Sequence, residues 1–437
     1  MSNPTADDVL FRAGGVSLQK YGRPWTRAAY DRTEADAYTF TRADAATCAT
    51  FVDSDLTLRT AAAGKLRGSW ADSNADGTAD VFGLLLESSR TNLCLQSEDF
   101  GTTWAAIGTP TRSSSAATCG SLSLDLIGDD SGAVAEGYRQ TWVTGVVATG
   151  VNGFSVFVAA GTTVATCGMV FNDTTASANK VTADIGFSAG VVTVTCTSGS
   201  CVKIDRLAGG VYRLHFQTAT CLAANAHRLD IYPAGGVAFT AAAVGNIYVG
   251  GVQLENAPYP SSYIKTTTVA VTRAADALSF PIGFAPQDMT VYAKVARPAW
   301  ADVSGTIDDP AFVDIGKSSG GTGVSFVLMG GNATRTLGAY LDTPTTDTTA
   351  SAALPAGATL AFCGQFATPT VSGSVKVDVG SGFGAASTGA TAVTGWTDQR
   401  VVVGTGTSWA PMDGLLLDLI VLRGSYTLAE CQATPIP

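Results

Sequence analysis

Basic residues and histidine are scarce in this chain of 437 residues. Lys and Arg total 26 against 36 Asp and Glu, the formal net charge is −10, and only 2 residues are His. No run of Lys and Arg could neutralise a row of phosphates, which argues against nucleic acid as a partner. Two histidines also leave few candidates for the general base of a hydrolase.

Long apolar runs are missing as well. The first residues, MSNPTADDVLFRAGG, lack the basic segment followed by an apolar segment that marks an export signal. No apolar stretch approaches the ~20 residues that a membrane helix needs. We therefore expect no membrane insertion and synthesis in a reducing cytoplasm.

Cysteine is present without the spacing of a structural site. The nine cysteines are an odd number and contain no C-x-x-C, which argues against a complete disulfide framework and against a zinc ribbon. Most are expected to be small buried hydrophobes. Cys196 and Cys201, in VTCTSGSCVKI, are the one candidate disulfide, because a turn-rich spacer joins two strand-like flanks.

The residues that are abundant predict an all-β protein. The chain is 46% hydrophobic and 14% charged, with 49 glycines, a composition that suits short strands and tight turns. A single core stops growing at roughly 250–300 residues, so two domains are expected. The predicted fold is two antiparallel β-sandwiches of jelly-roll type, residues 96–280 and 281–437, preceded by an extended, irregular N-terminal attachment region, residues 1–95.

Alternating hydrophobicity predicts individual strands in both sandwiches. In VYRLHFQ, Tyr212, Leu214 and Phe216 would face a core, and the alternate face, with Arg213 and His215, would face water. The only helical signal is TLAECQA near the end, where Thr427 is expected to be the N-cap and Glu430 to complete the capping box. The remaining predicted strands are SLSLDLIG, GFSVFVAAG, GVVTVTCTSG and GNIYVGGVQLE, followed by MTVYAKVARP, GVSFVLMGG, RTLGAYLD, TLAFCGQFA, SVKVDVG, QRVVVGTG and GLLLDLIVLRG.

Two segments carry a resemblance to a known family. GLLLESSRTNLCLQSEDF with the later Trp104, and VGGVQLENAPYPSSYIKTTTVAVTRAADALS (residues 249–279), resemble a recurrent module of bacteriophage virion proteins found in tail and head appendages. The stretch between them is similar to the jelly-roll of carbohydrate-binding modules. The final segment, WAPMDGLLLDLIVLRGSYTLAE, is similar to the end of concanavalin-like or laminin-G-like sandwiches.

The resemblance implies a non-enzymatic structural component of a phage particle, such as a tail or head fibre, spike or decoration. Its expected partners are other virion proteins, further copies of itself in a trimer, and host-surface polysaccharide, and its expected location is the virion. No cofactor is implied. The alternatives are a tail-associated enzyme that degrades polysaccharide and a capsid decoration protein that binds no ligand.

The sequence contains candidate residues for a metal site and for a sugar-binding site. In DSNADGTAD, the residues Asp72, Asn74, Asp76 and Asp80 match the first part of a calcium loop, but Gly83 stands where a bidentate Glu belongs, so a polar hairpin tip is preferred to calcium. Trp396 and Trp409 lie in turn-like surroundings and are the candidate sugar platforms. The other rings considered, Trp104, Tyr138, Trp142 and Trp300, are expected to be core or interface.

Catalytic candidates have little support. His215 and His227 lie in strand-like or turn-like sequence without a nucleophile motif, and the carboxylate pairs Glu87 with Glu98 and Asp308 with Asp309 have no feature that would raise a pKa.

The acidic stretch in LLLESSRTN is better interpreted as a structural junction. Arg90 is expected to pair with Glu87 or with a carboxylate on a neighbouring strand, and Asn92 to satisfy backbone groups. The echo between TRADA (41–45) and TRAADA (272–277) suggests a local pair of Arg273 with Asp276.

Overall fold

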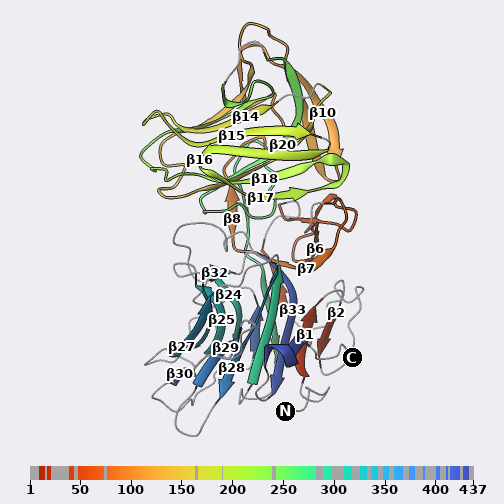
Figure 1. Cartoon of the computed structure of the whole chain (residues 1–437), viewed down its shortest axis with the longest axis vertical. Helices are drawn as coiled ribbons and strands as arrows, with labels where there is room; N and C mark the ends of the chain where they lie inside the picture. Colours follow the sequence, from red (N-terminus) through yellow and green to blue (C-terminus); the bar gives the residue numbers. More distant parts are fainter. Residues whose placement is uncertain are drawn as a thin grey trace.

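The computed structural model describes residues 9–14, 17–20, 39–43, 48–72, 76–162, 166–188, 190–238, 243–281, 289–296, 310–315, 325–331, 336–342, 348–353, 359–367, 374–378, 387–388, 400–403, 410–411, 414–423 and 427–432. The expected all-β class is confirmed: these residues form antiparallel sheets in two stacked bodies (Figure 1). Among them, helix is limited to two 3-10 turns, η2 (Ala208–Gly210) and η3 (Gly236–Ala238), and one short α-helix, α1 (Leu428–Gln432).

The upper body, here called the middle sandwich, is built from two sheets of six described strands. The first sheet has the order β10 (Thr111–Cys119), β11 (Leu122–Asp129), β20 (Gly245–Glu255), β13 (Gly153–Ala160), β18 (Tyr212–Gln217) and β17 (Ser200–Arg206). The second has the order β16 (Val191–Ser198), β15 (Ala178–Ser188), β14 (Cys167–Asp173), β19 (His227–Tyr232), β12 (Gly137–Trp142) and β9 (Ala105–Ile107). Because the chain crosses repeatedly between the two, the body is a jelly-roll type of sandwich.

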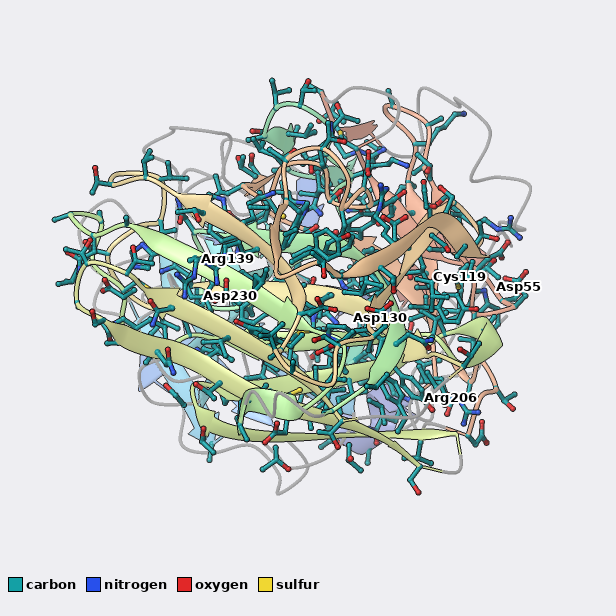
Figure 2. All side chains as sticks on the ribbon, turned by 90° about the horizontal axis from the view of Figure 1, so that it is seen from above. Asp55, Cys119, Asp130, Arg139, Arg206 and Asp230 are labelled. Atoms are coloured by element: carbon teal, nitrogen blue, oxygen red, sulfur yellow. The ribbon has the colours of Figure 1, made fainter. Side chains whose placement is uncertain are left out.

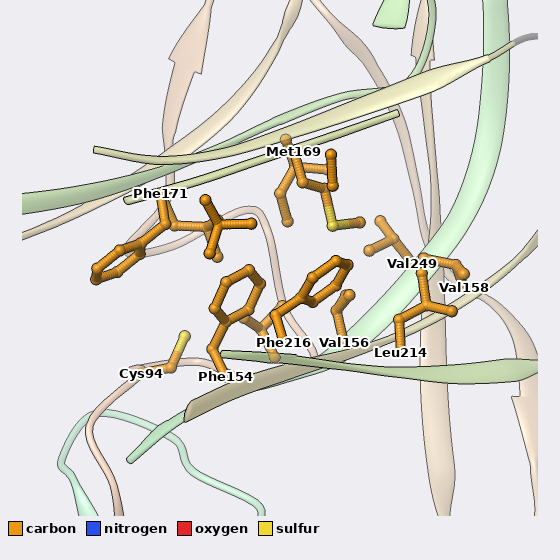
Figure 3. Close-up of a cluster of buried hydrophobic side chains, with 14 of the residues drawn as sticks. Cys94, Phe154, Val156, Val158, Met169, Phe171, Leu214, Phe216 and Val249 are labelled. Atoms are coloured by element: carbon orange, nitrogen blue, oxygen red, sulfur yellow. The ribbon is translucent and has the colours of Figure 1, made fainter. Parts of the chain in front are cut away.

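The core of the middle sandwich lies between these sheets. Phe154 and Phe216 of the first sheet stack with ring centroids 4.7 Å apart, and Phe154 also stacks on Phe171 of the second sheet at 5.8 Å. Figure 3 shows these rings with Met169 and Val249 filling the space between the sheets. Alternate residues of each strand supply this core, as the period of two in the sequence predicts.

The lower body, here called the C-terminal sandwich, pairs a nine-stranded with an eight-stranded sheet among the described residues. The nine-stranded sheet has the order β2 (Ser17–Lys20), β1 (Val9–Gly14), β33 (Gly414–Arg423), β23 (Met289–Ala296), β28 (Thr359–Ala367), β29 (Ser374–Asp378) and β30 (Ser387–Thr388), with β7 (Val81–Leu86) on β33 and β6 (Arg67–Ala71) on β7. The eight-stranded sheet has the order β27 (Thr348–Ala353), β26 (Thr336–Asp342), β25 (Ser325–Gly331), β24 (Pro310–Ile315), β31 (Arg400–Val403), β22 (Ala277–Pro281) and β3 (Thr39–Thr41), with β32 (Ala410–Pro411) beside β24.

Much of the segment expected to be a separate N-terminal arm belongs to this lower body. Strands β1, β2, β6 and β7 extend the nine-stranded sheet, and β3 pairs with β22 at the edge of the other sheet. The pairing is dictated by long-range backbone hydrogen bonds, which a short apolar run such as VFGLLL does not reveal by itself. The described strands β1, β2, β3, β6 and β7 are therefore part of the sheets of the C-terminal sandwich.

A small hairpin, β4 (Thr50–Val52) with β5 (Leu58–Thr60), covers the outer face of the first sheet of the middle sandwich. Leu58 packs in one buried cluster with Cys119, Leu122 and Phe157. Cys119 and Asp55, labelled in Figure 2, lie at this contact, where the Cys119 Sγ is 3.8 Å from the Leu56 carbonyl oxygen. The hairpin thus links the two bodies through packing.

The C-terminal helix has the predicted cap. The Thr427 Oγ1 accepts a hydrogen bond from the Glu430 N–H at 3.3 Å, and the Glu430 carboxylate accepts one from the Thr427 N–H at 2.8 Å. This reciprocal pair is the capping box expected from the sequence. Across the part of the chain that the structure describes, no helix has the length and apolar character needed to cross a membrane.

Candidate functional site

The two segments that carry the family resemblance meet between the bodies. Strand β8 (Arg90–Asn92) pairs antiparallel with β21 (Val271–Arg273), and the Asp276 N–H donates to the Glu87 carbonyl oxygen at 2.9 Å. Figure 1 shows β8 at the waist of the molecule, to the left of β6 and β7. Residues almost 190 positions apart are thereby brought to one place.

Glu87 is the centre of a buried ionic network, here called the joint, formed by Arg42, Arg67, Glu87, Arg273 and Asp276. The Glu87 carboxylate lies 2.8 Å from the Arg67 guanidinium and 3.0 Å from that of Arg273, and it accepts hydrogen bonds from the N–H and hydroxyl of Ser262. Burial alone would raise the pKa of Glu87, but Arg273 and Arg67 outweigh it and lower the pKa to about 2. Glu87 is therefore ionised at neutral pH and bridges the two arginines.

Asp276 holds the other half of the joint. Its carboxylate lies 2.5 Å from Arg67 and 3.3 Å from Arg42, and it accepts the Glu87 N–H at 3.0 Å. The expected local pair of Arg273 with Asp276 is wrong: Arg273 turns to Glu87 and to the Ser88 carbonyl. Residues three apart in an extended chain point to opposite sides, so each finds a distant partner.

Arg90 follows the same geometric rule. It pairs with Glu255 on β20, with 3.6 Å between Nε and the carboxylate, and its guanidinium lies 5.6 Å from the centre of the Tyr259 ring. Of the two partners expected for Arg90, the neighbouring-strand carboxylate is the one found, and Glu87 is taken by Arg67 and Arg273.

Asn92 and Glu98 satisfy buried polar groups where the chain enters the middle sandwich. The fully buried Asn92 amide donates to the carbonyls of Val252 and Ile264 and accepts from the Cys94 and Leu254 N–H groups. Glu98 accepts from the Lys265 ammonium at 2.6 Å and from the Tyr263 hydroxyl at 3.0 Å. Glu87 and Glu98 therefore serve different contacts and do not form a carboxylate pair.

A cavity of about 370 Å³ opens beside the joint. Its walls come from β4, β6 and β7 on one side, from β17 and β18 on the other, and from residues 259–263 and the edge of the C-terminal sandwich. Glu87 of the joint and its hydrogen-bond partner Ser262 line the cavity, so the joint also helps to shape it.

The cavity wall overturns one expectation about β18. Tyr212, Leu214 and Phe216 do face the core, but Arg213, His215 and Gln217 on the alternate face are buried too. Arg213 donates to the Ser261 carbonyl at 2.7 Å and to the Ser155 hydroxyl at 2.9 Å, and its guanidinium lies 5.2 Å from the centre of the Phe157 ring. The face expected to be wet is covered by chain segments distant in sequence.

His215 is held in a neutral state on this wall. Its Nε2 lies 2.8 Å from the Asp205 carboxylate, which also pairs with the Lys203 ammonium at 2.9 Å. Burial and then the nearby Arg213 cation lower the pKa of His215 to about 4, against the favourable effect of Asp205. Its Nδ1 has no hydrogen-bond partner in the described part of the chain. Ser155, its register partner, directs its hydroxyl to Arg213, so the described residues present no Ser-His-Asp triad here.

His227 is a core residue on β19 of the second sheet. Its ring is fully buried, stacks on Phe171 with 5.8 Å between centroids, and lies 4.0 Å from the Asp173 carboxylate. Burial lowers the pKa of His227. Neither histidine is placed as a general base beside a reactive hydroxyl.

The calcium-loop positions form a hairpin tip between β6 and β7. The Asp72 carboxylate accepts from the N–H groups of Asp76 and Gly77, Asp76 accepts from the Thr78 N–H at 2.7 Å, and the Asp80 N–H donates to the Ala71 carbonyl. Asn74 lies outside the described residues. Among the residues that are described, no group of three or more His, Cys, Asp and Glu could hold a metal ion. The carboxylates seen here close turns.

The candidate aromatic platforms divide into three groups. Trp396 and Trp409, like Trp300, Asp308 and Asp309, lie outside the described residues. Trp104, Tyr138 and Trp142 belong to the core of the middle sandwich, as expected. Trp70, which was not among the rings expected to bind sugar, is half-buried and lines the cavity. Its position in a short strand just before a polar turn was the available signal.

Cys196 and Cys201 are free thiols in the structure. They lie near each other, and burial followed by the proximity of Cys196 raises the pKa of Cys201 to about 12. The expected hairpin does not form between their strands, because β16 and β17 belong to opposite sheets and the chain crosses over at Gly199, whose φ is 64°. The two cysteines therefore lie near each other on strands of opposite sheets, and no disulfide joins them.

Thiol titration of the protein tests this state. We expect nine reactive thiols after unfolding in denaturant, because all nine cysteines are free. In the folded protein Cys196 and Cys201 should react before the other seven, which are buried, and slowly, because a raised pKa lowers the thiolate fraction. A count of seven after unfolding without reductant would show that a disulfide forms.

Comparison with known proteins adds little to these observations. No protein-family model matches the chain, and no curated protein matches it either. One matching solved structure is that of mouse laminin alpha1 chain, domains LG4-5, at 10% sequence identity and a TM-score of 0.22, covering 68% of this chain and 89% of that chain. A TM-score this low supports no inference about function. Any proposal about function therefore rests on the residues of this chain.

Proposed function

We propose that the protein is a non-enzymatic structural component of a bacteriophage particle, in a tail or head appendage. The observation that supports the proposal most is the joint: the residues through which the sequence resembles phage virion modules converge on one buried network. Such a network fixes two sandwiches in one orientation, which is what a load-transmitting appendage requires. In this proposal, the acidic residues that could suggest catalysis have a structural role.

The finer parts of the proposal follow from the resemblance. The middle sandwich corresponds to a carbohydrate-binding type of jelly-roll and the C-terminal sandwich to a concanavalin-like or laminin-G-like domain. The protein would assemble as a homotrimer with other virion proteins, bind host-surface polysaccharide, and work without a cofactor. Closed rotational symmetry suits repeated copies of one chain on a particle.

Purification of the particles that encode the chain tests this function. We expect its peptides to band with the major capsid protein in a density gradient and to be found by mass spectrometry, and antibody against it to label one appendage by electron microscopy. A non-structural protein of the same phage, such as its polymerase, serves as the control and should stay in the lysate. If this chain stayed there too, the proposal would be wrong.

A further inference from the structure

The cavity beside the joint has the surface chemistry of a ligand site. Trp70 and Phe51, which come from the neighbouring strands β6 and β4, are half-buried and line one wall. Ile204 of β17 lines the other wall and is 40% exposed, the kind of apolar contact that a bound ligand would cover. A volume of about 370 Å³ falls in the range of roughly 300–1,000 Å³ typical of small-molecule sites.

The polar groups of the cavity carry a balanced charge. The cations that line it are Lys203, Arg206 and Arg213, and the anions are Asp72, Glu87 and Asp205. Each anion already has partners within the protein: Asp205 has Lys203 and His215, Glu87 has Arg67 and Arg273, and Asp72 accepts backbone N–H groups. The cavity therefore offers both donors and acceptors without a surplus of either charge.

A hydroxyl group can satisfy both kinds of partner, because it donates to a carboxylate and accepts from an ammonium or guanidinium. Sugar rings also present apolar C–H faces that pack on aromatic side chains. A charged ligand would bind poorly in this cavity. The lining charge of opposite sign is already paired within the protein, and the lining charge of the same sign would repel the ligand. The combination of rings with balanced polar groups selects an uncharged, polyhydroxylated ligand.

We propose that this cavity, formed by both bodies of the molecule, binds an uncharged saccharide unit. The inference rests on the proposed function and deepens it by locating glycan recognition beside the joint, at Trp70 and Lys203. The side chain of Lys203 is 46% exposed and that of Asp205 is 31% exposed, so both polar groups can reach a ligand in the cavity. A site walled by two bodies also explains a need for their fixed orientation.

The test uses the full chain labelled with 5-fluorotryptophan and followed by ¹⁹F NMR. The Trp70 resonance is assigned as the signal lost in Trp70→Phe, and maltose, cellobiose, lactose and, as a charged counterpart, digalacturonate are titrated up to their solubility limits. We expect at least one of the three neutral sugars to shift the Trp70 signal saturably and digalacturonate to bind at least tenfold more weakly. Lys203→Met should weaken the neutral sugar by about tenfold, whereas Lys65→Met, an exposed lysine outside the lining, should leave its affinity unchanged.

Each other outcome overturns the inference. If none of the neutral sugars moves the Trp70 signal, or only digalacturonate does, the cavity does not bind uncharged saccharides. If sugar moves other tryptophans but not Trp70, glycan binding lies elsewhere. Equal affinities in Lys203→Met and Lys65→Met would also remove the site. The proposed virion role is tested separately by particle purification and survives any of these results.

Discussion

Replacing Arg67 by Met is expected to weaken the joint by about 3–5 kcal/mol. The Arg67 side chain is fully buried, and its guanidinium contacts Glu87 at 2.8 Å and Asp276 at 2.5 Å. Methionine has a similar length but no charge, so the variant leaves two buried carboxylates with one cation fewer between them. Breaking a buried ion pair from one side costs about this amount, since the remaining charge is left uncompensated.

Hydrogen exchange with mass spectrometry measures the effect where it occurs, which avoids treating a two-body protein as a single two-state unit. Peptides covering residues 84–92 and 261–276 should exchange about 10²–10⁴-fold faster in Arg67→Met, the factor that corresponds to about 3–5 kcal/mol. The matched control is Arg59→Met, because Arg59 pairs with Asp53 and Asp55 on the surface with 45% of its side chain exposed. That change should cost under about 1 kcal/mol. Equal effects of the two variants would mean that the joint contributes no more than a surface pair.

The second large effect is a loss of stability in acid, in two stages. The pKa of His215 is lowered to about 4 from an ordinary value of 6.5, so the folded state binds its proton less readily than the unfolded state does. Stability from this group is complete above about pH 6.5 and is lost as the pH falls toward 4. The pKa of Glu87 is lowered to about 2 from 4.5, which extends the loss from about pH 4.5 to 2.

Each stage is worth on the order of 3 kcal/mol, because one pKa unit corresponds to about 1.4 kcal/mol. Glu255 and Asp230 oppose the trend, since burial raises the pKa of each carboxyl and the folded state takes up their protons more readily. Asp230 lies with Arg139 on the second sheet, well apart from Arg206 at the cavity (Figure 2). Asp230 thus acts away from the cavity that His215 and Glu87 line, so its contribution should add to theirs.

Urea denaturation at a series of pH values from 7.5 to 4 tests the first stage. The wild-type midpoint should fall as the pH drops below about 6.5. In His215→Gln, which cannot titrate in this range, the midpoint should start lower at pH 7 but lose much of that slope. Parallel pH profiles for the two proteins would show that His215 is not held neutral by the fold.

The sequence predicted what depends on local pattern. Alternation located most strands of both sandwiches, and the spacing of Thr427 and Glu430 located the helix cap. Local pattern could not show that the second face of β18 is covered, because the covering residues, including Leu58 and Tyr263, are distant in sequence. The place of β1, β3 and β7 could not be predicted for the same reason, since β1 and β7 pair with β33 and β3 pairs with β22, both beyond residue 270.

Most residues of the candidate site could be predicted from the sequence, but the ion pairs that they form could not. Glu87, Arg90, Arg273 and Asp276 were all expected at a junction, yet each charge is paired across the fold and not with its neighbour in the chain. No sequence pattern pointed to Arg67. Arg42 belongs to the short TRADA echo, and in the structure it lies next to Asp276. Trp70 was missed because a ring in a short strand is usually assigned to a core.

A double-mutant cycle on Arg67→Met and Glu87→Gln tests the central claim, that the acidic motif is a structural joint. Opening free energies of residues 84–92, measured by hydrogen exchange, should give a coupling of about 2–3 kcal/mol, in the upper part of the range for residues in contact. The pair Glu87→Gln and Arg90→Met, whose side chains have different partners, should be additive within about 0.5 kcal/mol. Additive effects of Arg67 and Glu87 would contradict the account.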